Sequence, residues 1–179
     1  VLRHRQALPS EAFLSLEQMI AMTPLSQDVL LPIIVVSCAW LHPQHPDPLG
    51  AHLHTLAAAL RLCLADANGR WGVVWDWCAL HQHPDESRGE LRTEREEELY
   101  QEGLLGVAAL LSHPSTTVVQ LTAKPKGYPM GYQLPTTFPG WATYHARAWP
   151  WAEAMMASLT KPSSRLLDLG KLDPGKLDG

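Results

Sequence analysis

The sequence predicts an α/β protein built on a parallel sheet with helices on its faces. Short runs rich in Val and Ile occur at three places and have the length of strands, and segments with helical periodicity lie between them. Strands that alternate with helices are typical of a parallel sheet with right-handed crossovers. The chain has 179 residues, of which 46% are hydrophobic, so it has the size and apolar content of one ordinary domain.

Helix and strand signals alternate in the first half of the chain. Ser10 is a suitable N-cap for an amphipathic segment, and Gly50 precedes a second segment dominated by Ala and Leu, which favour helices. Two shorter runs carry the Val and Ile residues that are enriched in strands. The elements expected here are a helix over residues 11–22, a strand over 32–38, a helix over 51–66 and a strand over 71–76.

The second half of the chain continues the alternation. Thr93 and Glu96 have the spacing of a capping box, in which each side chain bonds the backbone N–H of the other residue. Repeated Pro and Gly residues exclude a long helix between positions 123 and 143. The elements expected here are a helix over residues 93–112, a strand over 116–122, an irregular stretch over 123–143 and a helix over 144–160.

The chain divides into three parts by its composition. Residues 1–28 are expected to form an extension that carries the added helix, and residues 29–162 are expected to form the α/β domain. Residues 163–179 end in a repeated Gly-Lys-Leu-Asp unit and read as an extended C-terminal arm or linker, suited to docking on a neighbour.

Composition excludes several classes of partner. The formal charge is −4, from 14 Lys and Arg against 18 Asp and Glu, and no window combines basic with aromatic residues as a nucleic-acid surface requires. The longest apolar stretch is well short of the ~20 residues that span a bilayer, so no membrane span is expected. Three cysteines in apolar segments indicate reduced thiols and a reducing compartment, the cytosol or an organelle.

Functional side chains are expected where the strands end. Trp40 follows the first strand, Asp76 ends the second, Trp77 comes next, and Trp149 and Trp151 lie near the start of the last helix. In a parallel sheet these positions converge. With seven Trp against two Phe in the chain, they predict one of two arrangements. One is an aromatic-walled pocket for a planar ligand such as a nucleobase, and the other, the commoner, is packing of loops over the sheet edge.

Histidines and acids lie in the same region. Six histidines are in or near the first two loops, but no zinc-binding spacing occurs, and no metal site is expected. Asp47 and Asp76 are placed either to bond ribose hydroxyls or to cap helices, and capping is the commoner role. Glu153, beside Arg147 and tryptophans, suits acid–base work if buried, or simply complements a helix dipole. Ser37 and Cys38 are candidate nucleophiles only with a base alongside, which the sequence does not place.

Three segments share motifs with one known family. Residues 35–41 and then 45–50 have the form Ser-x-x-Trp-Leu followed by His-Pro-Asp-Pro-x-Gly. Residues 74–82 resemble a strand that usually ends Asp-aromatic-x-x-Leu-Pro-Gln, and residues 147–153 resemble Arg-x-Trp-Cys-x-x-Glu. In their order and spacing these segments resemble the Toll/interleukin receptor (TIR) domains, in particular the TIR-like modules of algae and other protists, over residues 32–160.

The resemblance implies a flavodoxin-like sheet and a role for one acid. In catalytic TIR domains the glutamate of the last motif carries cleavage of the nicotinamide glycosidic bond of NAD, and this role would fall on Glu153. Pro150 departs from the family pattern, because it stands where the Cys of that motif is usual. The residues that the resemblance and the loop positions assign are Glu153 as the catalytic residue and Trp40, Asp76, Trp77, Arg147 and Trp149 as ligand-binding residues.

Three functions follow from these observations, in the order in which we rank them. The first is a non-catalytic TIR-like module that binds other proteins, or a second copy of itself, within a larger assembly. The second is an NAD nucleosidase that uses Glu153, with NAD as its substrate and no resident cofactor. The third is a module that binds a nucleotide without turning it over.

Overall fold

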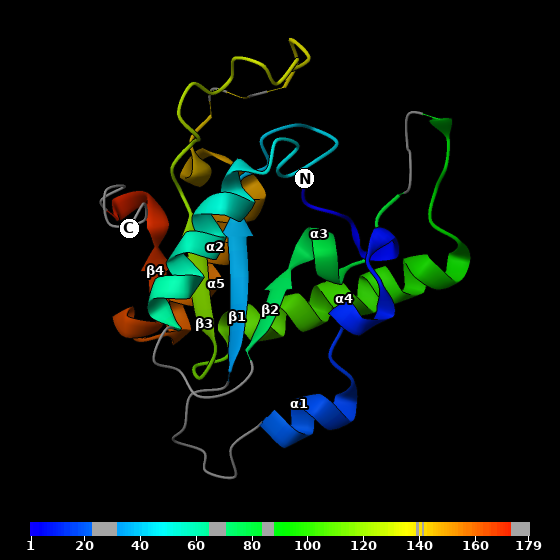
Figure 1. The fold of residues 1–179 in the computed structure, drawn as a ribbon, viewed down its shortest axis with the longest axis vertical. Coiled ribbons are helices and arrows are strands. Elements are labelled where there is room, and N and C mark those ends of the chain that lie inside the picture. Colours follow the sequence, from blue (N-terminus) through cyan, green and yellow to red (C-terminus); the bar gives the residue numbers. More distant parts are fainter. Residues whose placement is uncertain (23–31, 65–70, 84–87, 139, 141, 173–179) are drawn as a thin grey trace.

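A four-stranded sheet with every strand parallel lies at the centre of the protein, as seen in a computed structural model (Figure 1). The structure describes residues 1–22, 32–64, 71–83, 88–138, 140 and 142–172. The α/β class expected from the sequence is confirmed, and the three predicted strands are present. The strands are β1 (Ile33–Cys38), β2 (Gly72–Trp75), β3 (Thr117–Leu121) and β4 (Leu166–Asp168).

The order of the strands across the sheet is β2-β1-β3-β4. The chain winds outward from β1 to β2 and then returns past β1 to β3 and β4, so the direction of winding reverses between β1 and β3. In sheets of this kind a crevice for ligands lies outside the carboxyl ends of the strands at the reversal. In the register of the sheet, Ser37 of β1 is paired with Gln120 of β3 at this end.

Helices cover both faces of the sheet (Figure 1). The helix α2 (Ala51–Cys63) lies on one face, and α4 (Glu94–Ser112) and α5 (Ala148–Thr160) lie on the other. A single turn, α3 (Asp76–Ala79), directly follows β2, and α1 (Leu16–Met22) lies apart from the sheet, N-terminal to β1.

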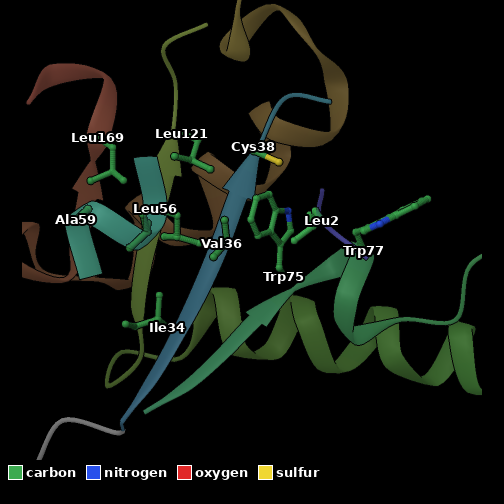
Figure 2. Close-up of a cluster of buried hydrophobic side chains, with 11 residues drawn as sticks. Leu2, Ile34, Val36, Cys38, Leu56, Ala59, Trp75, Trp77, Leu121 and Leu169 are labelled. Atoms are coloured by element: carbon green, nitrogen blue, oxygen red, sulfur yellow. The ribbon is translucent and has the colours of Figure 1, made fainter. Parts of the chain in front are cut away.

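Alternating side chains of β1 build two hydrophobic cores. Successive residues of a strand point to opposite faces, so Ile34 and Val36 pack toward α2, whereas Val35 packs toward α4 and α5. Figure 2 shows the first of these cores, in which Leu56 of α2 and Trp75 of β2 meet the strand residues. In the second core, the buried partners of Val35 are Leu80, Val107, Leu111, Val118 and Ala157.

Both ends of α4 are held by side chains. At its start Thr93 and Glu96 form the predicted capping box, which is confirmed in both directions. At its end the ammonium group of Lys161, itself 8% exposed, donates to the carbonyl oxygens of Leu110, His113 and Thr116. These bonds add to those that the carbonyl oxygens of Leu110 and His113 accept from the backbone N–H groups of His113 and Thr116.

Several predicted boundaries differ from the structure. The helix expected over 11–22 is instead a 3₁₀ turn at Ser10–Ala12 and then α1, because Ser15 and Gln18 form a second capping box: Ser15 N donates to Gln18 Oε1 at 2.8 Å and Gln18 N to Ser15 Oγ at 3.2 Å. The helix expected over 51–66 is described as far as Cys63, and residues 65–70 lie outside the described residues. The side chain of Cys63 also lies outside them.

The C-terminal part of the chain contributes to the sheet. An arm was expected from residue 163, but Leu166–Asp168 pair with Val118, Val119 and Gln120 of β3 as the fourth strand. The next residue, Leu169, is 5% exposed in the core beneath α2. Backbone pairing and burial of Leu169 hold this segment against the domain, and residues 173–179 lie outside the described residues. Within the described part of the chain, no helix is both long and apolar enough to cross a bilayer.

Candidate functional site

A cavity of about 360 Å³ lies at the carboxyl end of the sheet. Four of the residues expected to bind a ligand line it together, although they come from three distant segments of the chain. The other two expected site residues, Trp77 and Glu153, are not among its described lining residues. The lining consists of Cys38, Trp40, Asp76, Leu80, Gln82, Tyr100, Leu104, Arg147, Trp149 and Pro150.

Asp76 is the acid of this cavity. It follows the last residue of β2 and begins the turn α3, so that its Oδ1 accepts the backbone N–H of Trp77 at 2.6 Å. Burial raises the pKa of Asp76 above its ordinary value, while the bond from Trp77 and one from the side chain of Trp40 act in the opposite direction. The two strand ends thus bring an aromatic ring and a carboxyl group together.

Trp77 supports the cavity from behind. Its side chain is 8% exposed and belongs to the hydrophobic core beneath α2 (Figure 2). The rings of Trp40 and Trp77 meet edge to face, with centroids 5.4 Å apart and planes at 87°. Trp77 therefore packs against Trp40, which lines the cavity, and the role of Trp77 in ligand binding stays a prediction.

Arg147 ties the start of α5 to the loop after β1. Its Nη1 donates to the carbonyl oxygen of Trp40 at 2.5 Å, and its guanidinium lies 4.8 Å from the centre of the Phe138 ring. Two residues farther along, Trp149 is 47% exposed and forms part of the cavity wall. The first and third motif segments, more than a hundred residues apart, thus meet at one edge of the site.

Glu153 lies on the buried side of α5. Its side chain is 3% exposed, and its Oε2 accepts a hydrogen bond from Ser37 Oγ at 2.5 Å. Burial, the largest cause, raises the pKa of Glu153 to about 7, and the nearby charge of Asp76 adds to the rise. Hydrogen bonds from Ser37 and Trp149 oppose it. The carboxyl group is therefore poised to exchange a proton near neutral pH, but it is bonded to Ser37 rather than presented to the cavity.

Ser37 is the centre of a polar network between β1, β3 and α5. Its hydroxyl bonds Tyr144 Oη, and Gln120 Nε2 donates to the same Tyr144 oxygen at 3.4 Å. When Glu153 is ionised, every hydroxyl proton has an acceptor: the amide donates to the tyrosine, the tyrosine to the serine and the serine to the carboxylate. The structure thus places an acid beside Ser37, a neighbour that the sequence alone did not supply.

The thiol of Cys38 forms part of the cavity wall. Burial raises the pKa of this thiol well above its ordinary value, and nearby carboxylates act in the same direction. A nucleophilic cysteine requires the thiolate. Cys38 is therefore an inert part of the wall, and with Cys78 it is one of two described cysteines, both of which are free thiols.

Several residues of the site gave little or no signal in the sequence. Tyr100 and Leu104 reach the cavity from α4, where their helical spacing indicates only a core face, and the guanidinium of Arg92 lies 3.8 Å from the centre of the Tyr100 ring. Gln120 did carry a signal, because it is a long polar residue inside an apolar strand. Buried polar groups almost always have hydrogen-bond partners, and this one faces Tyr144.

The acid of the first loop has a structural role. Asp47 is fully buried, and its Oδ2 accepts the backbone N–H of Leu53 at 2.8 Å, which caps the start of α2. The capping role anticipated for such an acid is confirmed for Asp47. In the described part of the chain, no three or more His, Cys, Asp and Glu side chains come together in a group that could hold a metal ion.

The sequence matches no family model and no curated protein, and the structure matches no solved structure.

Proposed function

We propose that this chain is a TIR-like module that binds a nucleotide of the NAD type in the cavity at the carboxyl end of its sheet, without turning it over. One observation carries the proposal: Trp40, Asp76, Arg147 and Trp149, each expected to bind ligand, line a single cavity of about 360 Å³. This volume is within the range of small-molecule sites. Because of this cavity, we rank ligand binding ahead of the protein-interaction role that the sequence favours.

The arrangement of the chain supports the family resemblance. The strand order β2-β1-β3-β4 is that of the first four strands of a flavodoxin-like sheet. The three motif segments contribute residues to the same cavity, as expected of motifs that serve one site. A flavodoxin-like, TIR-like domain is therefore part of this proposal.

The chemistry of the wall matches a nucleotide. The indoles of Trp40 and Trp149 offer apolar faces for a planar ring. The carboxyl group of Asp76 is placed to accept hydrogen bonds from ribose hydroxyls. The guanidinium of Arg147 adds positive charge at the edge of the site, which favours a phosphate group.

The position of Glu153 supports binding without cleavage. A catalytic acid or base has to reach the atoms that react. Glu153 is 3% exposed and bonded to Ser37, so cleavage of a ligand in the cavity would require this carboxyl group to leave its partner. Pro150, which replaces the usual Cys of the motif, itself lines the cavity.

The test is titration of the purified chain with NAD. Calorimetry measures binding, and an assay of free nicotinamide measures cleavage. We expect binding without release, and Trp149→Ala should weaken binding about tenfold, the order of one base–aromatic stacking contact. Trp151→Ala is the matched control, because Trp151 lies on the same helix and is similarly exposed, at 53% against 47%, outside the described lining. Absence of binding would overturn the proposal. Release that vanishes in Glu153→Ala would establish an NAD nucleosidase instead.

A protein-interaction role is the second candidate, and one feature of α5 favours it. Trp151, Met155 and Leu159 are four residues apart along the helix and therefore share one face, and all are exposed, Leu159 by 83%. Apolar side chains gathered on a surface favour docking of another protein. If a second copy docks here, sedimentation should show concentration-dependent dimers that Leu159→Ser removes and that Leu62→Ser, on α2, leaves unchanged. A monomer at every concentration would exclude self-association.

A further inference from the structure

The N-terminal residues lie along the loop that follows β2. The closest contact is made by Gln6, whose side-chain amide pairs with the backbone of Gln82 in both directions. Gln6 Nε2 donates to Gln82 O at 2.7 Å, and Gln82 N donates to Gln6 Oε1 at 3.2 Å. Gln6 Nε2 also lies 3.3 Å from Glu96 Oε1 at the start of α4. One side chain therefore connects the loop to the helix.

Arg5 holds the same loop at two further points. Its Nη1 donates to the carbonyl oxygen of Ala79 at 3.0 Å, and its Nε donates to His81 Nε2 at 3.2 Å. The opposite ring nitrogen, His81 Nδ1, lies 3.3 Å from Glu96 Oε1. A guanidinium group can only donate, so His81 Nε2 is the acceptor of the bond from Arg5. Together, the side chains of Arg5 and Gln6 bind three of the four residues from 79 to 82.

The segment is also anchored at its beginning. Leu2 is 7% exposed and packs in the core beneath α2 (Figure 2). The carbonyl oxygen of Leu2 accepts from His45 Nε2 at 2.9 Å, and that of Arg3 from Cys78 Sγ at 3.3 Å. Residues 2–6 are therefore bound at each of several successive positions rather than at a single point.

The loop held in this way is a wall of the cavity. Leu80 and Gln82 both line it. The side-chain amide of Gln82 turns back to the carbonyl oxygens of Leu80, at 3.1 Å, and Asp76, at 3.4 Å. The backbone of Gln82 is thus hydrogen-bonded to Gln6, and the side chain of Gln82 is hydrogen-bonded to the turn that begins with Asp76.

We propose that residues 2–6 act as a clasp that belongs to the ligand site, with Arg5 and Gln6 as positioning residues that hold the cavity wall at residues 80–82 through Gln82. The clasp rests on the proposed function in one respect, namely that the cavity binds a ligand. Its effect on the wall itself is independent of any ligand.

The test compares Gln6→Met with Gln18→Met in the full chain. Methionine keeps the length of glutamine and removes its hydrogen bonds. Gln18 is an exposed residue of the same N-terminal region whose side chain accepts a hydrogen bond from Ser15 N in the described structure and does not reach the loop, so it is the matched control. The reporters are hydrogen exchange at the amide of Leu80, which donates to Asp76 O, and the NMR signal of the Trp40 indole in the cavity. Neither group contacts Gln6 directly.

We expect Gln6→Met to speed exchange at Leu80 at least about fivefold, the effect of one net hydrogen bond, to shift the Trp40 indole signal, and to weaken NAD binding by a similar factor. Gln18→Met should change none of these. An unchanged Leu80 amide and Trp40 signal would overturn the clasp, as would faster exchange spread equally over β1 and β3. If NAD does not bind the unmodified chain, the proposed function fails, and the two reporters still decide the clasp. Arg5→Lys, which keeps the charge, replaces Gln6→Met if the latter does not fold.

Discussion

Replacing Glu153 by Gln should make the protein more stable at pH 8 and hardly change it at low pH. The pKa of this carboxyl group is raised from an ordinary value of 4.5 to about 7, chiefly by burial. The folded protein therefore holds the proton more tightly than the unfolded chain, and the free energy of unfolding falls as the pH rises from about 4.5 to about 7. The amide introduced by Glu153→Gln does not titrate, and its oxygen still accepts the hydrogen bond from Ser37.

The size of the effect follows from the two pKa values. The difference between 4.5 and about 7, at ~1.36 kcal/mol for each pH unit, corresponds to an upper limit of ~3 kcal/mol at pH 8. At pH 5 the same calculation gives a difference in the free energy of unfolding of less than ~1 kcal/mol. Urea unfolding of both proteins at pH 5, 6, 7 and 8 measures the difference directly, and effects of other titrating groups cancel in it.

A control and a contrary result define this experiment. Glu98→Gln removes an exposed carboxylate that pairs with Arg95 on α4, and because an exposed ion pair contributes little to stability, this variant should unfold like the unmodified protein. If the difference between Glu153→Gln and the unmodified protein were constant from pH 5 to pH 8, or if the variant were less stable at pH 8, the reasoning would be refuted. Burial would then not oppose ionisation of Glu153.

Two further predictions concern buried residues at helix ends, Lys161 after α5 and His52 at the start of α2. Lys161→Met should lower the free energy of unfolding by ~2 kcal/mol or more, because it removes the hydrogen bonds of a buried charged group to three carbonyl oxygens at the end of α4. Urea unfolding measures this loss, and Lys161→Arg should recover part of it. Burial lowers the pKa of His52, so the unfolded chain binds more protons at this residue than the folded protein does. The stability that depends on neutral His52 is therefore present above about pH 6.5 and is lost as the pH falls through the lowered pKa. Thermal melts from pH 7 to pH 5 should therefore fall less steeply in His52→Gln, and an equally steep fall would contradict the assignment.

Features that depend on residues close together in the chain were the easiest to predict from the sequence. The capping box of Thr93 and Glu96 was predicted because its two residues lie three positions apart and interact within one turn. The same spacing occurs at Ser15 and Gln18, but the apolar periodicity of residues 11–22 favours one continuous helix and outweighs it in the sequence. The short strand β4 lay beyond such signals, because three residues carry too little periodicity and its partner β3 is more than forty residues away.

The candidate site divides in the same way. Trp40 and Asp76 could be predicted to meet, because each directly follows a strand and parallel strands end at one edge. Gln82 and Tyr100 could not, because their place in the wall depends on how the loop after β2 and the helix α4 pack. The N-terminal clasp was equally hidden, since no pattern in residues 2–6 indicates a partner seventy-six positions away.

The main strands and helices between β1 and α5, their parallel arrangement and the edge at which the candidate site lies are readable in the order of residues, because periodicity and strand ends are local properties. The fate of Glu153 is different. It lies three residues after Pro150, which lines the cavity, yet its carboxyl group is bonded to Ser37 in the interior. The packing of α5 against β1 decides between a carboxylate that faces a ligand and one that is buried, and this packing depends on every contact of the helix at once.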